Sequence, residues 1–146
     1  MSYPLNVISK LNNYNSLLTV AISSVSTQLK ILLEKLILVL PSINKNINFL
    51  LIVQGNKIYN ELPDYPNKII KIIFSDTIGL SCSRNIAINN VNSQWIWFQD
   101  DDIEINIGEL DKLINALNFS NSDVFLTKIL SLESKKEYYK NYSYYQ

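Results

Sequence analysis

Apolar residues along the chain gather in short runs that follow two different spacings. Runs of β-prone apolar residues predict strands, and apolar residues at helical spacing between them predict helices. We expect strands over residues 17–23, 47–53, 68–74, 94–99 and 123–130, and helices over 28–38, 81–91 and 110–117. This alternation is typical of an α/β fold with a mostly parallel sheet and flanking helices, in which ligands bind at the carboxyl ends of the strands.

Individual residues sharpen the ends of these elements. Pro41 ends the first helix, because proline cannot continue one. Gly55 ends the second strand, whose unbroken apolar run indicates burial on both faces. The third strand alternates more, which predicts a place nearer a sheet edge. Ser81 is expected to cap the second helix, because its hydroxyl can accept an unpaired amide of the first turn.

Length and charge narrow the class of protein. We treat residues 1–146 as a single domain that ends in a polar, tyrosine-rich tail over 131–146. The formal net charge is zero and the cations are scattered, which argues against nucleic-acid binding. The first residues lack the basic start and apolar run of a signal peptide. We therefore expect a cytoplasmic protein, with the inner face of the membrane as an alternative location.

The residue types that are missing limit the chemistry. Cys82 is the only cysteine and the chain has no histidine, which excludes an intrachain disulfide, cysteine-rich zinc sites and Ser/His/Asp or Cys/His hydrolysis. A bound metal must then be held by oxygen. Mg²⁺ and Mn²⁺ prefer oxygen ligands, so these are the ions to consider.

An acidic triplet is the first candidate for chemistry. Asp100, Asp101 and Asp102 follow the apolar run over 95–98 after a single glutamine, on a strand that we expect to be buried. Three neighbouring carboxylates repel one another unless a cation compensates them. A divalent ion that bridges them to a ligand diphosphate would relieve this repulsion. The alternative is a solvated acidic loop that caps the next helix.

Arg84 is the second candidate. It is the only arginine of the chain and lies in the first turn of the helix predicted after Gly79. A helix start offers unpaired amides and a favourable dipole to an anion, and a guanidinium suits bidentate contact with phosphate. The alternative is a surface ion pair with Asp76 or Glu104.

Together these stretches resemble the family-2 glycosyltransferases of the GT-A fold. In that family a Gly-Leu/Ser-x-x-x-Arg-Asn-x-Ala helix precedes an apolar strand that ends in a DxD motif. Residues 79–87, Gly-Leu-Ser-Cys-Ser-Arg-Asn-Ile-Ala, and then 95–102 match this order. The strands over 19–23 and 50–55 extend the match, which covers most of the chain up to about residue 130. The resemblance implies a GT-A, Rossmann-like sheet that is incomplete relative to a full glycosyltransferase domain.

The resemblance also implies a function. The expected reaction transfers a sugar from a nucleoside diphosphate donor, with a UDP-sugar favoured, to a glycan or lipid-linked hydroxyl acceptor in bacterial surface polysaccharide synthesis. Asp100 would lie near the ribose and the metal, and Asp102 would be the principal ligand of Mn²⁺ or Mg²⁺. Ser23, Arg84 and Asp101 complete the expected nucleotide-sugar site.

Two departures from the family pattern qualify this expectation. Gln54 stands where the family usually has an aspartate that reads the uracil edge; it could pair with a different base, or lie in solvent at the strand end. The family's general base lies well beyond the DxD motif. Glu133 and Glu137 are the only carboxylates after Asp123, so we expect the base to be absent from this chain.

Three other functions remain open. A catalytically incomplete fragment could bind a nucleotide or a partner through an exposed sheet edge, which also favours self-association. A phosphatase of the haloacid dehalogenase type is disfavoured, because Ile103, Glu104 and Ile105 follow the triplet where Gly and Thr or Ser would be needed. A nucleotidyltransferase shares the need for a metal beside a diphosphate.

Overall fold

The computed structural model describes residues 15–43, 46–55, 61–102, 104–121 and 123. Within them a four-stranded sheet has the order β3-β2-β1-β4, and every neighbouring pair is parallel. The strands are β1 (Ser16–Val25), β2 (Ile47–Gln54), β3 (Ile70–Ser75) and β4 (Ser93–Asp100). The α-helices are α2 (Leu29–Val39), α3 (Leu80–Asn90) and α4 (Ile107–Phe119). The predicted α/β class with a parallel, Rossmann-like sheet and flanking helices is confirmed.

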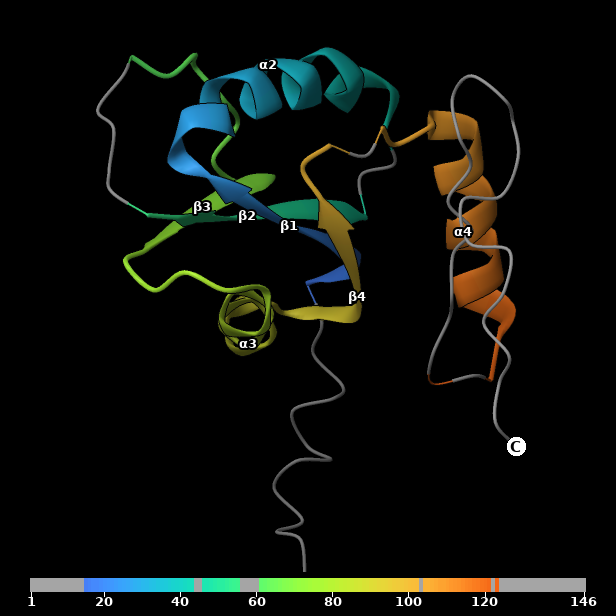
Figure 1. Ribbon diagram of the computed structural model, residues 1–146. Coiled ribbons are helices and arrows are strands. Elements are labelled where there is room, and N and C mark those ends of the chain that lie inside the picture. Colours follow the sequence, from blue (N-terminus) through green and yellow to red (C-terminus); the bar gives the residue numbers. More distant parts are fainter. Residues whose placement is uncertain (1–14, 44–45, 56–60, 103, 122, 124–146) are drawn as a thin grey trace, which may run out of the picture.

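The sheet separates two apolar layers, because successive side chains of a strand point to opposite faces. Figure 1 shows α2 and α3 on opposite sides of the sheet, with α4 beside β4. The larger cluster joins β1 and β2 to the leucines of α2 and to α4; its most buried members include Val20, Leu33, Leu51 and Leu110. The smaller cluster, Ala21, Leu50, Ile52 and Ala87, joins the other face of the sheet to α3.

The two central strands and the two outer strands differ in burial. β2 is buried at every position but one, as its unbroken apolar run predicts. β3 is an edge strand with mixed burial, which confirms the prediction from its alternation. β4 is the other edge of the sheet within the described residues, and its residues 95–98 are only half-buried. The prediction of a buried strand before the aspartates was therefore wrong, because no further strand of the described chain covers that edge.

The ends of the helices also differ in part from the prediction. After α2, Pro41 falls in a short 3₁₀ turn, Leu40–Ser42. α3 begins after Gly79, which has φ of 142°, and no side chain caps it. The prediction that Ser81 is the cap was wrong, since Ser81 lies inside the first turn. α4 begins earlier than predicted because the Asn106 side chain accepts a hydrogen bond from the Glu109 amide at 3.2 Å.

The predictions for the last part of the chain concern residues that the structure does not describe. The strand predicted over 123–130 and the tyrosine-rich tail over 131–146 lie outside the described residues, apart from Asp123. Among the helices of the described residues, none is long and apolar enough to span a membrane.

Candidate functional site

The parallel register brings polar residues to one edge of the sheet, at the carboxyl ends of the strands. Asp100, the last residue of β4, lies opposite Ser23 of β1. Gln54, the last residue of β2, lies between Val25 of β1 and Ser75 of β3. We call this the carboxyl edge. Residues that are far apart in the sequence are thus neighbours at this edge.

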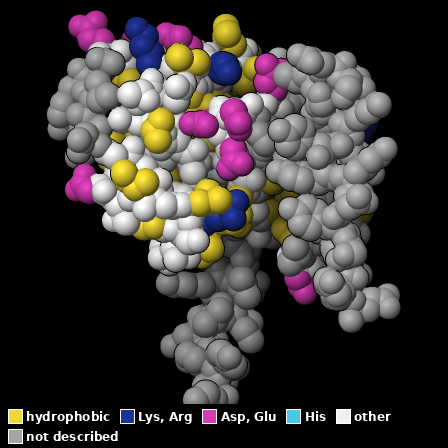
Figure 2. All heavy atoms as spheres, in the orientation of Figure 1, with side chains coloured by type: hydrophobic (Ala, Val, Ile, Leu, Met, Phe, Trp, Pro, Cys, Tyr) yellow, Lys and Arg dark blue, Asp and Glu magenta, His cyan; other side chains and the backbone are white. Residues whose placement is uncertain are grey.

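The acidic triplet forms the exposed part of the carboxyl edge. Asp100 ends β4, and Asp101 and Asp102 make the turn that follows it. Asp100 and Asp102 are exposed, whereas Asp101 is half-buried and accepts a hydrogen bond from the Ser24 hydroxyl, with 2.6 Å between Oγ and Oδ2. Figure 2 shows acidic side chains gathered near the centre of this face of the molecule. The outer two carboxylates are therefore open to a ligand, while the middle one is tied to β1.

Ser23 is linked to the first turn of α3 through a pair of hydroxyls. Its Oγ lies 2.7 Å from Oγ of Ser83, which is fully buried. Ser83 also donates to the Leu80 carbonyl at 2.9 Å. A hydroxyl has one hydrogen, so both contacts are satisfied together only when Ser23 donates to Ser83. The Ser23 oxygen can then serve a ligand as an acceptor.

Gln54 is linked to the residue before α3. Its Nε2 donates to the Gly79 carbonyl at 2.8 Å, and its Oε1 accepts from the Gly79 amide at 3.1 Å. The residue is only 8% exposed. The alternative of a strand-end glutamine in solvent is thus wrong, because both ends of the amide are engaged with the backbone. The prediction that Gln54 reads a base stays a prediction.

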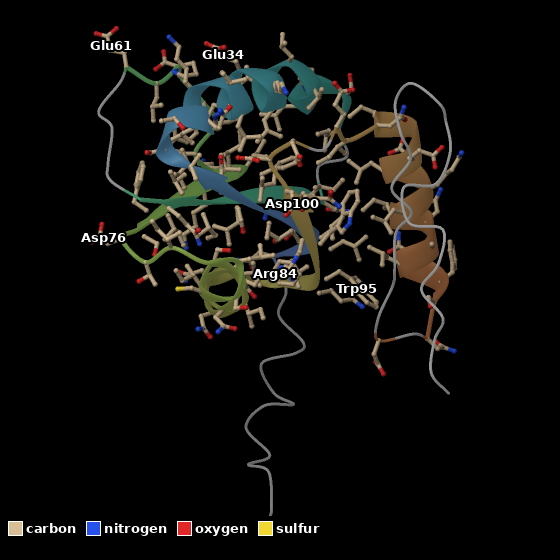
Figure 3. All side chains as sticks on the ribbon, in the orientation of Figure 1. Glu34, Glu61, Asp76, Arg84, Trp95 and Asp100 are labelled. Atoms are coloured by element: carbon tan, nitrogen blue, oxygen red, sulfur yellow. The ribbon has the colours of Figure 1, made fainter. Side chains whose placement is uncertain are left out.

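Arg84 is exposed and extends from α3 towards β4. Its guanidinium carbon lies 5.5 Å from the centre of the Phe98 ring, within the range of a cation–π contact. Figure 3 labels Arg84 and Asp100 on the same face of the molecule. Within the described residues the one ion pair is Lys112 with Glu109 on α4, so the alternative of Arg84 paired with Asp76 or Glu104 is not found there. This contact places the Arg84 cation beside β4, at a residue two positions before the triplet.

The side chains at the carboxyl edge suit a hard divalent cation in their donor type. Asp100 and Asp102 offer exposed carboxylate oxygens, which Mg²⁺ and Mn²⁺ prefer. The described residues hold no group of three or more His, Cys, Asp or Glu side chains arranged as a metal cage. Mg²⁺ is usually bound by one or two carboxylates together with water and ligand phosphates, so a two-aspartate arrangement fits such an ion.

Sequence reasoning missed three residues that shape this site. Ser24 orients Asp101, Ser83 anchors the start of α3 to β1, and Phe98 receives the Arg84 cation. Ser83 could have been found from the sequence, since its place in the first helical turn beside Arg84 is visible there. The partners of Ser24 and Phe98 depend on the packing of α3 and the turn against the sheet, which the sequence does not display.

A comparison with protein families identifies the family of this chain. Residues 13–145 match the family model described as Glycosyl transferase family 2. Neither the curated proteins nor the solved structures gave a match. The matched region contains the whole described sheet, the first turn of α3 and the acidic triplet. The chain belongs to glycosyltransferase family 2.

Proposed function

We propose that the carboxyl edge binds a nucleoside diphosphate sugar through a divalent metal, and that the sugar passes to the hydroxyl of a glycan or lipid-linked acceptor. A UDP-sugar is the favoured donor, and bacterial surface polysaccharide synthesis is the proposed setting. The observation that carries the proposal is the convergence of two exposed carboxylates, a lone arginine and a half-buried serine at one edge of the sheet.

Each residue of the carboxyl edge would bind a different part of the donor. Arg84 would contact the diphosphate, because a guanidinium offers several donors in a plane that matches phosphate oxygens. Ser23 would accept a hydrogen bond from a ribose or base donor, since its own hydrogen is given to Ser83. Asp101 would present the carboxylate oxygen that Ser24 leaves unused. In this division, the anionic phosphates would lie beside the Arg84 guanidinium. The hydroxyl groups of the donor would lie beside Ser23 and Asp101, which accept hydrogen bonds.

Asp100 and Asp102 would hold Mn²⁺ or Mg²⁺. When bound, such an ion neutralises the charge that develops on a departing nucleoside diphosphate. By holding that ion, the two aspartates would orient the diphosphate towards Arg84. Without the cation, the same carboxylates would repel the diphosphate, so nucleotide binding is expected to require the metal.

Calorimetry of UDP, GDP and CDP binding to the full chain, with and without Mn²⁺, tests the proposal. Binding of UDP that needs Mn²⁺ and is lost in Asp102→Ala is the expected result. Glu104→Ala is the matched control, because Glu104 is an exposed carboxylate close in sequence. Metal-dependent binding that is unchanged in Asp102→Ala would contradict the proposal.

The second candidate is a binding module without transferase activity. It is separated from the first by incubating the chain with UDP-sugars and following release of the sugar with and without a chelator. Hydrolysis or transfer that disappears with the chelator supports the enzyme. Metal-dependent nucleotide binding with no turnover of any donor or acceptor supports the module instead.

A further inference from the structure

The two hydrogen bonds between Gln54 and Gly79 imitate a backbone pairing. In an antiparallel ladder, two directly opposed residues exchange an N–H···O bond in each direction. The Gln54 side chain does the same with a single residue, at 2.8 Å from Nε2 to the Gly79 carbonyl and 3.1 Å from the Gly79 amide to Oε1. The pairing joins the carboxyl end of β2 to the residue that precedes α3.

Gly79 is the residue through which such a pairing can control α3. Its carbonyl also accepts the Ser83 amide at 3.1 Å, which is the first hydrogen bond of the helix. Its φ of 142° lies in a region that other residues rarely adopt. Glycine adopts such a conformation without a steric penalty, so the two hydrogen bonds from Gln54 serve to select it among the many that glycine can adopt.

Three strands hold the start of α3 by different side chains. Gln54 of β2 pairs with Gly79, Ser23 of β1 pairs with Ser83, and Phe98 of β4 lies under the Arg84 guanidinium. The first two contacts fix the backbone on either side of the first turn. The third then determines where the cation lies above the sheet.

From this arrangement we infer that Gln54 is a positioning residue that holds the first turn of α3 and thereby places Arg84 at the carboxyl edge. The inference rests on the proposed function in one respect, the role of Arg84 towards a diphosphate. Glutamine suits the task for a chemical reason. Glutamate has no amide hydrogen for the Gly79 carbonyl, and a residue that is only 8% exposed, with both ends of its amide engaged, is poorly placed to read a base.

The first measurement is amide hydrogen exchange at Gly79 in the full chain and in Gln54→Met. Methionine keeps an unbranched side chain of similar length but makes neither hydrogen bond. Gln94→Met is the matched control, because Gln94 is exposed at the amino end of β4. We expect Gly79 to exchange about tenfold faster in Gln54→Met and at the native rate in the control. Unchanged exchange at Gly79 would overturn the inference.

The second measurement separates positioning from base reading. Calorimetry of UDP, GDP and CDP with Mn²⁺ is repeated on Gln54→Met and on Gln54→Glu. We expect both substitutions to weaken the binding of all three nucleotides by a common factor of about ten. Gln54→Glu keeps an acceptor for the Gly79 amide but opposes a carboxylate to the Gly79 carbonyl. A changed order of the three nucleotides, or tighter UDP binding in Gln54→Glu, would overturn the inference in favour of base reading.

A double-mutant cycle with Arg84→Ala tests whether Gln54 acts through Arg84. In that background we expect Gln54→Met to change nucleotide affinity less than twofold, because the position of residue 84 no longer matters once its guanidinium has been removed. An undiminished effect would refute the route through Arg84. If the native chain binds none of the three nucleotides, the proposed function fails, and exchange at Gly79 alone then decides whether Gln54 holds the turn.

Discussion

The carboxyl edge has two parts that are built in opposite ways. On the side of β1 and β2, the polar groups of Ser83 and Gln54 are buried and paired within the protein. On the side of β4, Asp100 and Asp102 are exposed. We call the first part the anchored side and the second the acidic side. The anchored side therefore fixes the geometry, and the exposed acidic side is the part that we propose binds a ligand.

The two sides differ in how much stability a substitution costs. A buried polar group that loses its partner destabilises the fold, because water cannot replace the hydrogen bond. An exposed carboxylate is already solvated, so its replacement by a neutral group of the same size costs little stability. Substitutions on the two sides should therefore separate stability from binding.

The largest effect is expected on the acidic side. Asp102→Asn keeps the size of the side chain but removes its charge, and we expect it to weaken Mn²⁺-dependent UDP binding by about 100-fold. The thermal midpoint should stay close to that of the native chain, because Asp102 is exposed. Calorimetry and a thermal melt measure the two quantities. A large drop in the midpoint without loss of binding would contradict the division.

Gly79→Ala tests the backbone of the anchored side. A Cβ at this position meets no atom within 4 Å, so any cost comes from the φ of 142° and not from a clash. We expect a loss of about 1–3 kcal/mol in the free energy of unfolding, the typical cost of holding a non-glycine residue in such a region. Urea denaturation measures it. Asn90→Ala, at the exposed far end of α3, is the control, and an equal loss in both variants would argue against a special role for Gly79.

Ser83→Ala tests the hydroxyl pair between β1 and α3. The substitution removes the acceptor of Ser23 and the donor to the Leu80 carbonyl in a fully buried position. We expect about 1–2 kcal/mol of destabilisation in urea denaturation. Ser81→Ala, in the same turn but exposed, should be nearly neutral. If Ser81→Ala destabilised the chain as much, Ser81 would have a capping role that the structure does not give it.

The smallest effect is expected away from both sides. Lys112→Ala breaks the ion pair with Glu109 on α4, in which the side chains are 74% and 68% exposed. Such a pair contributes less than about 0.5 kcal/mol, so neither unfolding nor nucleotide affinity should change measurably. A clear loss of nucleotide affinity would show that α4 takes part in the site, which would then extend beyond the anchored and acidic sides.

Much of the fold could be predicted from the sequence because hydrophobic spacing reports burial directly. The apolar run over 47–53 and the leucines of the first helix predicted β2 and α2 to within a residue or two. The burial of β4 was overestimated, because an apolar strand has the same sequence pattern at the edge of a sheet as at its centre. The start of α3 was misplaced because Gly79 precedes the helix with a partner from the end of β2.

By itself, the sequence determined the α/β alternation, the three consecutive aspartates after a strand and the lone arginine in a first helical turn. These are local properties that residue type and spacing decide. Only the tertiary structure decided which polar groups meet. Gln54 with Gly79, Ser23 with Ser83, and Ser24 with Asp101 are separated by 25, 60 and 77 positions. Such pairings follow from strand order and register, which bring distant residues within the short reach of a hydrogen bond.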